Sequence, residues 1–171
     1  MTPDDGHAAV DLETALAGTP DGHKEDLRLW LRMLSAVNLI EAEIRRRLRE
    51  QFATTLPRFD LLAQLDRKPE GLTLGEISRR MMVSNGNVTA LAASLAADGL
   101  VERRAHPADR RAHLLCLTPA GRKNFVRQSA AHERWIAELF ASVSSADRAS
   151  LHRLLGAVKT GVRQTLREET V

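Results

Sequence analysis

The chain has 171 residues, one cysteine, no tyrosine, 4% aromatic residues and a formal net charge of +3. One cysteine excludes a disulfide within the chain, and no apolar run approaches the roughly 18 residues of a membrane-spanning helix. The scarcity of aromatic side chains argues against single-stranded nucleic acid, which is bound by stacking bases on aromatic rings. Residues 1–23 carry five acidic residues and no Lys or Arg, so their charge is −5 and residues 24–171 carry +8. Such a basic body is typical of polyanion binders, and the lack of a basic leader predicts a soluble, cytoplasmic protein.

The predicted elements begin after this acidic segment. Residues 1–23 are rich in Gly and Pro and predict a mobile arm, with a short helical turn around residues 10–16. Apolar residues at helical spacing predict a long amphipathic helix over residues 24–50. Pro57 suits the first position of a following short helix that ends near Arg67.

Two further short helices are predicted in the middle of the chain. Thr73 and, three residues later, Glu76 match a capping box, which predicts a helix over residues 73–82. Ser84 suits the N-cap of the next helix, over residues 84–98. The short connection between them predicts a helix-turn-helix.

A β-hairpin and two long helices complete the prediction. Residues 101–105 and 113–117 are strand-like on either side of a turn at residues 106–109. Helices are predicted over residues 118–143, with Thr118 as N-cap, and over residues 145–168. The predicted fold class is mainly α with a small hairpin, a winged helix-turn-helix flanked by long helices.

The first turns of helix 84–98 carry small polar residues that suit the DNA major groove. The groove admits one α-helix, Asn pairs bidentately with adenine, and a Thr methyl contacts the thymine methyl. Ser84 and Asn85 are also good helix caps, which is the alternative reason for their presence. Asn87 and Thr89 lie inside the helix, where capping does not explain them.

Four arginines lie in the hairpin: Arg103, Arg104, Arg110 and Arg111. Arginine suits the narrow, electronegative minor groove because its guanidinium is more weakly hydrated than the lysine ammonium. A carboxylate at Asp109 would repel phosphate, so we interpret it as the partner that orients a guanidinium across the turn. The alternative is a solvated charged loop.

Three blocks in this region resemble the MarR family of transcription regulators: GLVER at 99–103, DRRA at 109–112 and LTPAG at 117–121. The resemblance covers residues 72–122 closely. It implies an obligate homodimer with interleaved first and last two helices, and a wing motif of Asp109 and the arginine pair that touches the minor groove. The predicted DNA contacts are Thr73, Ser84, Asn85, Asn87, Val88, Thr89, Arg103, Arg104, Asp109, Arg110 and Arg111.

The long terminal helices favour the same assembly. Their apolar stripes exceed what one winged helix buries, and a two-fold partner is the commonest way to cover them. Two recognition helices would then face half-sites about one helical turn apart, which predicts a pseudo-palindromic double-stranded operator. The chain is predicted to divide into an arm (1–23), an N-terminal dimerisation helix (24–56), a DNA-binding lobe (57–117) and C-terminal dimerisation helices (118–171).

The resemblance also implies repression that a small effector relieves by favouring a dimer unsuited to the operator. Some members instead oxidise a cysteine near the first helix, but this chain has only Cys116, which we predict to be a buried hydrophobe. The block at 81–89 resembles a subgroup that responds to aromatic acids or hydroxycinnamoyl-CoA thioesters, whose phosphates the arginines at 45–49 or Arg58 would bind. Because pockets are apolar with a few polar groups, the candidate effector residues are Trp30, Met33, Asn38, Arg58, Phe59, His132 and Trp135.

Other functions find less support in the sequence. It has no Gly-rich phosphate loop and no nucleophile elbow, so no enzyme and no cofactor is predicted. His106, His113 and Cys116 match no common zinc spacing, so no metal is predicted. His132 is predicted to be a hydrogen-bonded core histidine. The alternative function is a winged helix that binds a protein instead of DNA. The charge of +8 on residues 24–171 argues against this alternative.

Overall fold

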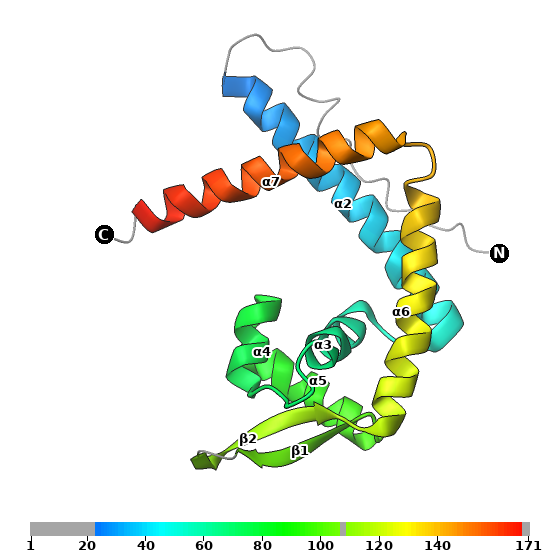
Figure 1. The fold of residues 1–171 in the computed structure, drawn as a ribbon, viewed down its shortest axis with the longest axis vertical. Helices are drawn as coiled ribbons and strands as arrows, with labels where there is room; N and C mark the ends of the chain where they lie inside the picture. The colour runs from blue at the N-terminus through cyan, green and yellow to red at the C-terminus, as the bar shows by residue number, and fades with distance from the viewer. Residues whose placement is uncertain (1–22, 107–108, 169–171) are drawn as a thin grey trace, which may run out of the picture. The chain divides into compact units, whose positions relative to one another are not determined.

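The structure, a computed structural model, describes residues 23–106 and 109–168, and the side chains of residues 106–112 lie outside this description. The predicted arm, apart from His23, and its turn at residues 10–16 therefore lie outside the described residues. The chain divides into two compact units, the first ending at Ala130 and the second beginning at Ala131. The elements are α2 (His23–Phe52), α3 (Leu56–Asp66), α4 (Leu74–Met81), α5 (Asn85–Ala97), β1 (Val101–His106), β2 (Asp109–Leu117), α6 (Pro119–Leu139) and α7 (Ser145–Glu168) (Figure 1).

This element order confirms the predicted fold class. The strands β1 and β2 form an antiparallel hairpin, hereafter the wing, in which Arg103 lies opposite Leu115 and Arg104 opposite Leu114. On the other edge of β2, Leu72 and Leu115 exchange backbone hydrogen bonds of 3.1 and 2.8 Å. The segment before α4 is thereby tied to the wing.

The capping signals correctly predicted the helix-turn-helix. Thr73 Oγ1 accepts a hydrogen bond from the Glu76 backbone N–H (3.2 Å), and the Glu76 carboxylate accepts one from the Thr73 N–H (2.8 Å). At the end of α4, Met82 adopts a left-handed conformation (φ 55°) that stops the helix. Ser84 Oγ then accepts from the Asn87 N–H (3.3 Å) and begins α5.

A Glu76→Gln substitution is expected to remove part of the pH dependence of folding. Hydrogen bonds from Thr73, first from its backbone and then from its hydroxyl, lower the pKa of Glu76. A carboxyl whose pKa is depressed on folding stabilises the protein above its unfolded-state pKa, and this stability is lost as the pH falls through the folded-state value. Glutamine keeps an acceptor but does not titrate. In urea unfolding, wild type should be more stable than the variant at pH 7, and the difference should shrink as the pH falls below the unfolded-state pKa of Glu76. A difference that does not change with pH would contradict the assignment.

Some boundaries differ from the sequence predictions. Helix α3 begins at Leu56 with Thr55 as its N-cap, so Pro57 occupies the second position of the helix. Helix α6 ends at Leu139 instead of residue 143, because the chain tightens into i→i+3 hydrogen bonds such as that from Val143 N to Phe140 O (3.0 Å). Strand β2 has nine residues instead of the predicted five.

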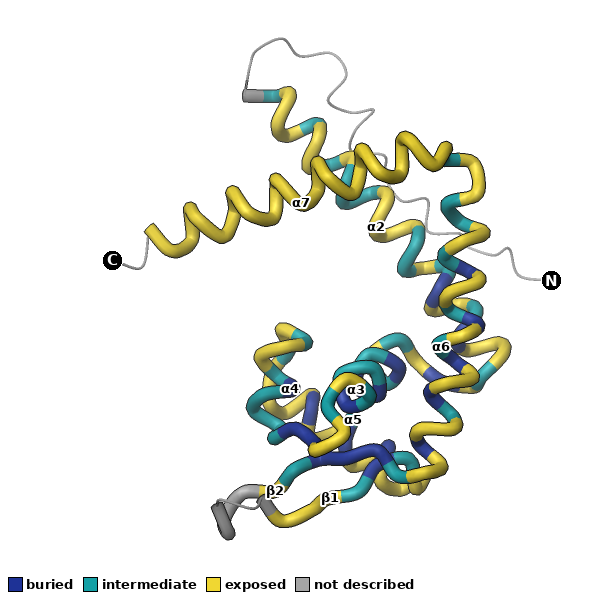
Figure 2. Tube along the Cα trace, in the orientation of Figure 1, coloured by how far each residue is buried: buried dark blue, intermediate teal, exposed yellow. Residues whose placement is uncertain are grey.

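The core of the first unit lies among α3, α4, α5 and the wing. Helix α3 packs on α4, α5 and β2, and α5 also packs on β1. The rings of Phe59 on α3 and Phe125 on α6 lie 5.6 Å apart between centroids. The largest apolar side chains that are under 2% exposed are Leu48, Leu61, Leu62, Leu65, Ile77, Val88, Leu95 and Leu115 (Figure 2).

The junction between α5 and α6 is built on close backbone packing. Thr118 Oγ1 donates to the Gly99 carbonyl (2.7 Å) and accepts from the Gly121 N–H (2.9 Å). A Cβ on Gly121 would lie 1.8 Å from the Leu100 carbonyl oxygen, so only glycine fits there. The LTPAG block is therefore a structural joint that fixes the wing to α6.

Helix α7, in the second unit, has no buried residue within the described chain (Figure 2). Asp147 N–H donates to Ser144 Oγ (3.1 Å), so Ser144 is the N-cap of α7. Its apolar residues recur at helical spacing and are 39–58% exposed: Leu151, Leu154, Leu155, Val158, Val162 and Leu166.

Candidate nucleic-acid interface

Helix α5 has one buried face and one outer ridge of very small residues. Val88, Ala92 and Leu95 are no more than 1% exposed and face the core. On the opposite side of the helix the exposed positions contain only glycine and alanine, and α5 contains no charged residue. Four residues at helical spacing form this outer ridge: Gly86, Ala90, Ala93 and Ala97.

The outer ridge lets another molecule approach the helix backbone closely. A Cβ on Gly86 would meet no atom within 4 Å, so packing within the chain does not require glycine there. A helix without long outer side chains fits deep in a groove of about 12 Å width. This ridge was not predicted, although its spacing opposite the apolar face is visible in the sequence.

The predicted base readers lie at the exposed start of α5, with one correction. Ser84, Asn85, Asn87 and Thr89 are exposed. Thr89 Oγ1 donates to the Asn85 carbonyl (2.8 Å), which leaves its methyl group as the part that points away from the helix backbone. Val88 is 0% exposed, so its predicted DNA contact is wrong: it packs in the core.

The structure brings two predicted contacts together beside α4. Thr73, Arg103 and His113 line a cavity of about 280 Å³, with Leu74 and Leu115 as its apolar part. Arg103 is exposed, whereas the Thr73 N–H and hydroxyl both donate to the Glu76 carboxylate (2.8 Å each). The exposed cation available to an anion in this cavity is therefore Arg103.

Arg104 has different surroundings from Arg103. Its guanidinium donates to the Glu102 carboxylate two residues earlier (2.6 and 2.8 Å), so its charge is partly neutralised. Asp109, Arg110 and Arg111 begin β2, but their side chains lie outside the described residues. Their predicted minor-groove role therefore stays a prediction.

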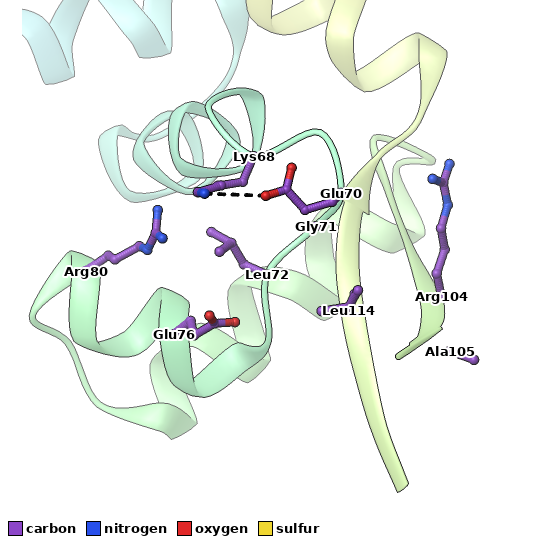
Figure 3. A pocket seen from close by; sticks show the side chains of 9 residues that line it. All are labelled: Lys68, Glu70, Gly71, Leu72, Glu76, Arg80, Arg104, Ala105 and Leu114. Atoms are coloured by element: carbon purple, nitrogen blue, oxygen red, sulfur yellow. Dashed lines mark ion pairs between the residues drawn. The ribbon is translucent and has the colours of Figure 1, made fainter. Parts of the chain in front are cut away.

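A second cavity, of about 400 Å³, lies between the turn before α4, α4 itself and the wing (Figure 3). Arg80 extends toward Lys68, whose Nζ lies 3.4 Å from a Glu70 carboxylate oxygen, and Leu72 lies below this ion pair in the view (Figure 3). Arg79 and Arg80 are exposed at the end of α4. Helix α5 has no cation, so Arg79 and Arg80 add exposed positive charge on the adjoining helix α4, and neither residue was predicted as a DNA contact.

The candidate effector residues on α2 and α3 have diverse environments. Trp30 is 55% exposed, Asn38 is exposed and Met33 is half-buried. Phe59 is 7% exposed and lies in the core beside Phe125. The Arg58 guanidinium donates to Ser94 Oγ and to the Asp98 carboxylate, so it connects α3 to the end of α5.

The arginine cluster of α2 is largely paired with carboxylates on the same helix. Glu43 accepts hydrogen bonds from Arg46 and Arg47, whose guanidinium groups lower its pKa to about 2. Arg45 pairs with Glu41, and Arg46 pairs also with Glu50. The cluster thus offers an effector less positive charge than its arginines alone suggest.

The second unit holds the two remaining effector candidates. Trp135 is 4% exposed, and His132 is half-buried. Burial lowers the pKa of His132, which favours the neutral imidazole at physiological pH.

Cys116 is a buried free cysteine, as predicted. Its Sγ lies 3.6 Å from the Glu70 carbonyl, and burial raises the pKa of its thiol. His113 lies three positions away on β2, on the opposite face, and is exposed. In the part of the chain that the structure describes, no three His, Cys, Asp or Glu side chains are grouped as a metal site.

Within residues 23–106 and 109–168, no helix combines the length and apolar character needed to cross a bilayer.

Known proteins share this arrangement of helices and wing. The family model described as MarR family matches residues 54–112. The HTH-type transcriptional regulator YdgJ of Bacillus subtilis (strain 168) is 28% identical over 105 residues, which are 61% of this chain and 63% of that protein. The chain therefore spans less than two thirds of this curated relative's length.

Solved structures extend the similarity along the chain. Sco3205 of Streptomyces coelicolor, a MarR family regulator solved in complex with DNA, is 22% identical with a TM-score of 0.71 and coverage of 84% of this chain and 92% of that chain. CouR of Rhodococcus jostii RHA1, solved with p-coumaroyl-CoA, is 17% identical with a TM-score of 0.66 and coverage of 76% and 90%. These two show the fold alone.

A MarR family transcriptional regulator from Silicibacter pomeroyi is more similar. It is 33% identical, with a TM-score of 0.73, and the alignment covers 84% of this chain and 99% of that chain. The chain therefore belongs to the MarR family of transcriptional regulators.

Proposed function

We propose that the protein is a homodimeric repressor that binds a pseudo-palindromic operator and is released by a small effector. The observation that carries this proposal is the outer surface of α5, where exposed Asn87 and Thr89 adjoin a ridge of glycine and alanine with no charge. A helix of this kind enters the major groove, and amide and methyl groups read base edges there. The DNA complex of the similarly folded Sco3205 supports this use of the fold.

Phosphate contacts in this proposal come from the surroundings of α5. Thr73 and Arg103 line one cavity, and Arg79 and Arg80 are exposed at the end of α4. Such contacts fix register and supply salt-dependent affinity without reading sequence. Arg110 and Arg111, oriented by Asp109, would reach the adjacent minor groove.

The homodimer is supported by uncovered apolar surface. The apolar residues of α7 are all more than a third exposed in one chain, and so are Leu27, Trp30, Val37 and Leu39 of α2. Monomeric proteins rarely leave contiguous apolar surface of this kind in water. In this proposal residues 24–56 and 118–171 dimerise, and residues 57–117 bind DNA.

The effector is proposed to be an aromatic acid or its coenzyme A thioester, as CouR in complex with p-coumaroyl-CoA suggests. Within the first unit, the rings of Phe59 and Phe125 lie together in the core, so an effector would contact them only by entering it. Gln128, one helical turn after Phe125, is 2% exposed, and its Oε1 has no hydrogen-bond partner among the described residues. A buried acceptor without a donor favours a ligand that supplies one. Trp30, Met33, Asn38, His132 and Trp135 stay further candidates.

An Arg110→Ala/Arg111→Ala double variant tests the proposed function. The probe is the duplex that wild-type protein enriches most strongly from a random-sequence library, hereafter the selected duplex. Loss of two wing cations should weaken binding to the selected duplex at least about tenfold without dissociating the dimer. Fluorescence anisotropy measures the affinity, and light scattering measures the oligomeric state.

Asn87→Ala is the matched test of base reading. It should reduce the preference for the selected duplex over single-base variants of it, with little change in affinity for a scrambled duplex. Unchanged affinity in the Arg110→Ala/Arg111→Ala variant would contradict the proposed DNA contact of the wing. Absence of any enriched duplex would contradict the proposed function and favour the protein-binding alternative.

A further inference from the structure

We infer that Arg58 is a positioning residue that fixes α5 for sequence discrimination, an inference that rests on the proposed function. Arg58 lies in the first turn of α3, whereas its partners lie 36 and 40 residues later in the chain. One guanidinium nitrogen donates to Ser94 Oγ in the last turns of α5. The other donates to the carboxylate of Asp98, the C-cap of α5.

The other contacts of α5 with the lobe are weakly directional. Its inner face consists of Val88, Leu91, Ala92 and Leu95, and α5 itself carries no charge before Asp98. Packing of these side chains opposes separation of the helices, but hydrophobic burial is non-directional, so it fixes the rotation and axial position of α5 less sharply than a hydrogen bond does. A planar guanidinium that bonds two acceptors constrains both rotation and translation.

The location of the pair favours a strong constraint. The Arg58 side chain is only 17% exposed, although Asp98 is 56% exposed. A cation at a helix C-terminus is also favoured by the helix dipole. The constraint acts at the end of α5 opposite to Asn87 and Thr89, so rotation there would turn both readers away from their bases. Recognition groups must be held within about 0.5 Å of their working position.

A second cross-element ion pair provides the matched control. Arg122 at the start of α6 donates to Asp66 at the end of α3 (2.8 Å), and neither residue belongs to α5. Arg58→Met and Arg122→Met each remove one positive charge and one ion pair while keeping an apolar stem. The carboxylate left behind in each variant stays in contact with water, since Asp98 is 56% and Asp66 32% exposed. Both variants should therefore melt within about 4 °C of wild type.

The readout is discrimination, measured as the ratio of affinities for the selected duplex and a scrambled duplex of the same composition. Arg58→Met should lower this ratio about tenfold, the effect of one lost base contact. Arg122→Met should leave the ratio unchanged. Because each variant removes one positive charge, Arg58→Met and Arg122→Met should lower the affinity for the scrambled duplex equally. Asp98→Asn should reproduce the loss with residue 58 intact, and it carries the test if Arg58→Met does not fold.

Each outcome separates this inference from the proposed function. If wild type discriminates between duplexes and Arg58→Met keeps the same ratio as Arg122→Met, the positioning role is overturned while the proposed function stands. If wild type prefers no duplex, the proposed function fails and this inference with it. The positioning role is supported if the ratio falls in Arg58→Met and in Asp98→Asn but not in Arg122→Met.

Discussion

A Leu154→Asp/Val158→Asp double variant is expected to be monomeric and to bind the selected duplex at least about a hundredfold more weakly than wild type. The two residues lie one turn apart on α7 and are 52% and 42% exposed in the single chain. Two buried carboxylates would oppose burial of this face against a second copy. A monomer also engages one half-site at a time, and linked sites gain roughly 10²–10⁴ over single ones. Analytical ultracentrifugation and anisotropy measure the two effects.

Thr160→Asp is the matched control for this variant. Thr160 lies two residues after Val158, so it is about 200° further round the helix and away from the apolar stripe. The variant adds the same charged group to the same helix. In the wild type, the Thr160 hydroxyl donates to the Gly156 carbonyl within α7 (3.0 Å). The Thr160→Asp variant should stay dimeric with unchanged DNA affinity. A dimeric Leu154→Asp/Val158→Asp protein would show that α7 is not the dimer surface.

Gly121→Ala is expected to destabilise the fold by about 3 kcal/mol, at the upper end for overpacking, and so to lower the melting temperature by roughly 6–12 °C. The added Cβ would meet the carbonyl oxygen and carbon of Leu100 at 1.8 and 2.8 Å. Both are backbone atoms, and the oxygen also accepts the hydrogen bond from Thr118 N–H (3.1 Å), so the strain cannot be relieved by a side-chain rotation. Differential scanning calorimetry measures the shift.

Gly86→Ala is the control for helix propensity. An alanine Cβ at this position meets no atom within 4 Å, and alanine is preferred to glycine in helices by up to about 1 kcal/mol. It should raise the melting temperature slightly or leave it unchanged. Equal melting temperatures for Gly121→Ala and wild type would contradict the close packing of residue 121 against the Leu100 backbone.

Local signals predicted most of the fold. The caps at Thr73 and Ser84 correctly marked the starts of α4 and α5, because a cap bonds backbone groups only two or three residues away. The length of β2 was underestimated, because turn-forming and charged residues at 109–111 indicate a loop in isolation. Pairing of Asp109 with His106 across the wing extends the strand nonetheless.

The sites were harder to predict where distant residues meet. Arg58 is a reasonable effector cation by residue type, but its partners, Ser94 and Asp98, are too far along the chain for a spacing rule. The pairing of Arg46 with Glu43 and Glu50 was visible as i,i+3 and i,i+4 spacing. Val88 was misassigned because it is adjacent to reader residues in sequence, whereas one residue along a helix turns the side chain by about 100°.

Recognition of an operator by a dimer can be tested by selecting duplexes from a random-sequence library with the wild-type protein. We expect enrichment of an inverted repeat whose half-sites are centred about one helical turn, roughly 10 base pairs, or a multiple of it apart. Binding to this sequence should weaken steeply with salt, because neutralised phosphates release counterions. Recovery of no enriched sequence, or of an asymmetric one with a single half-site, would contradict the account.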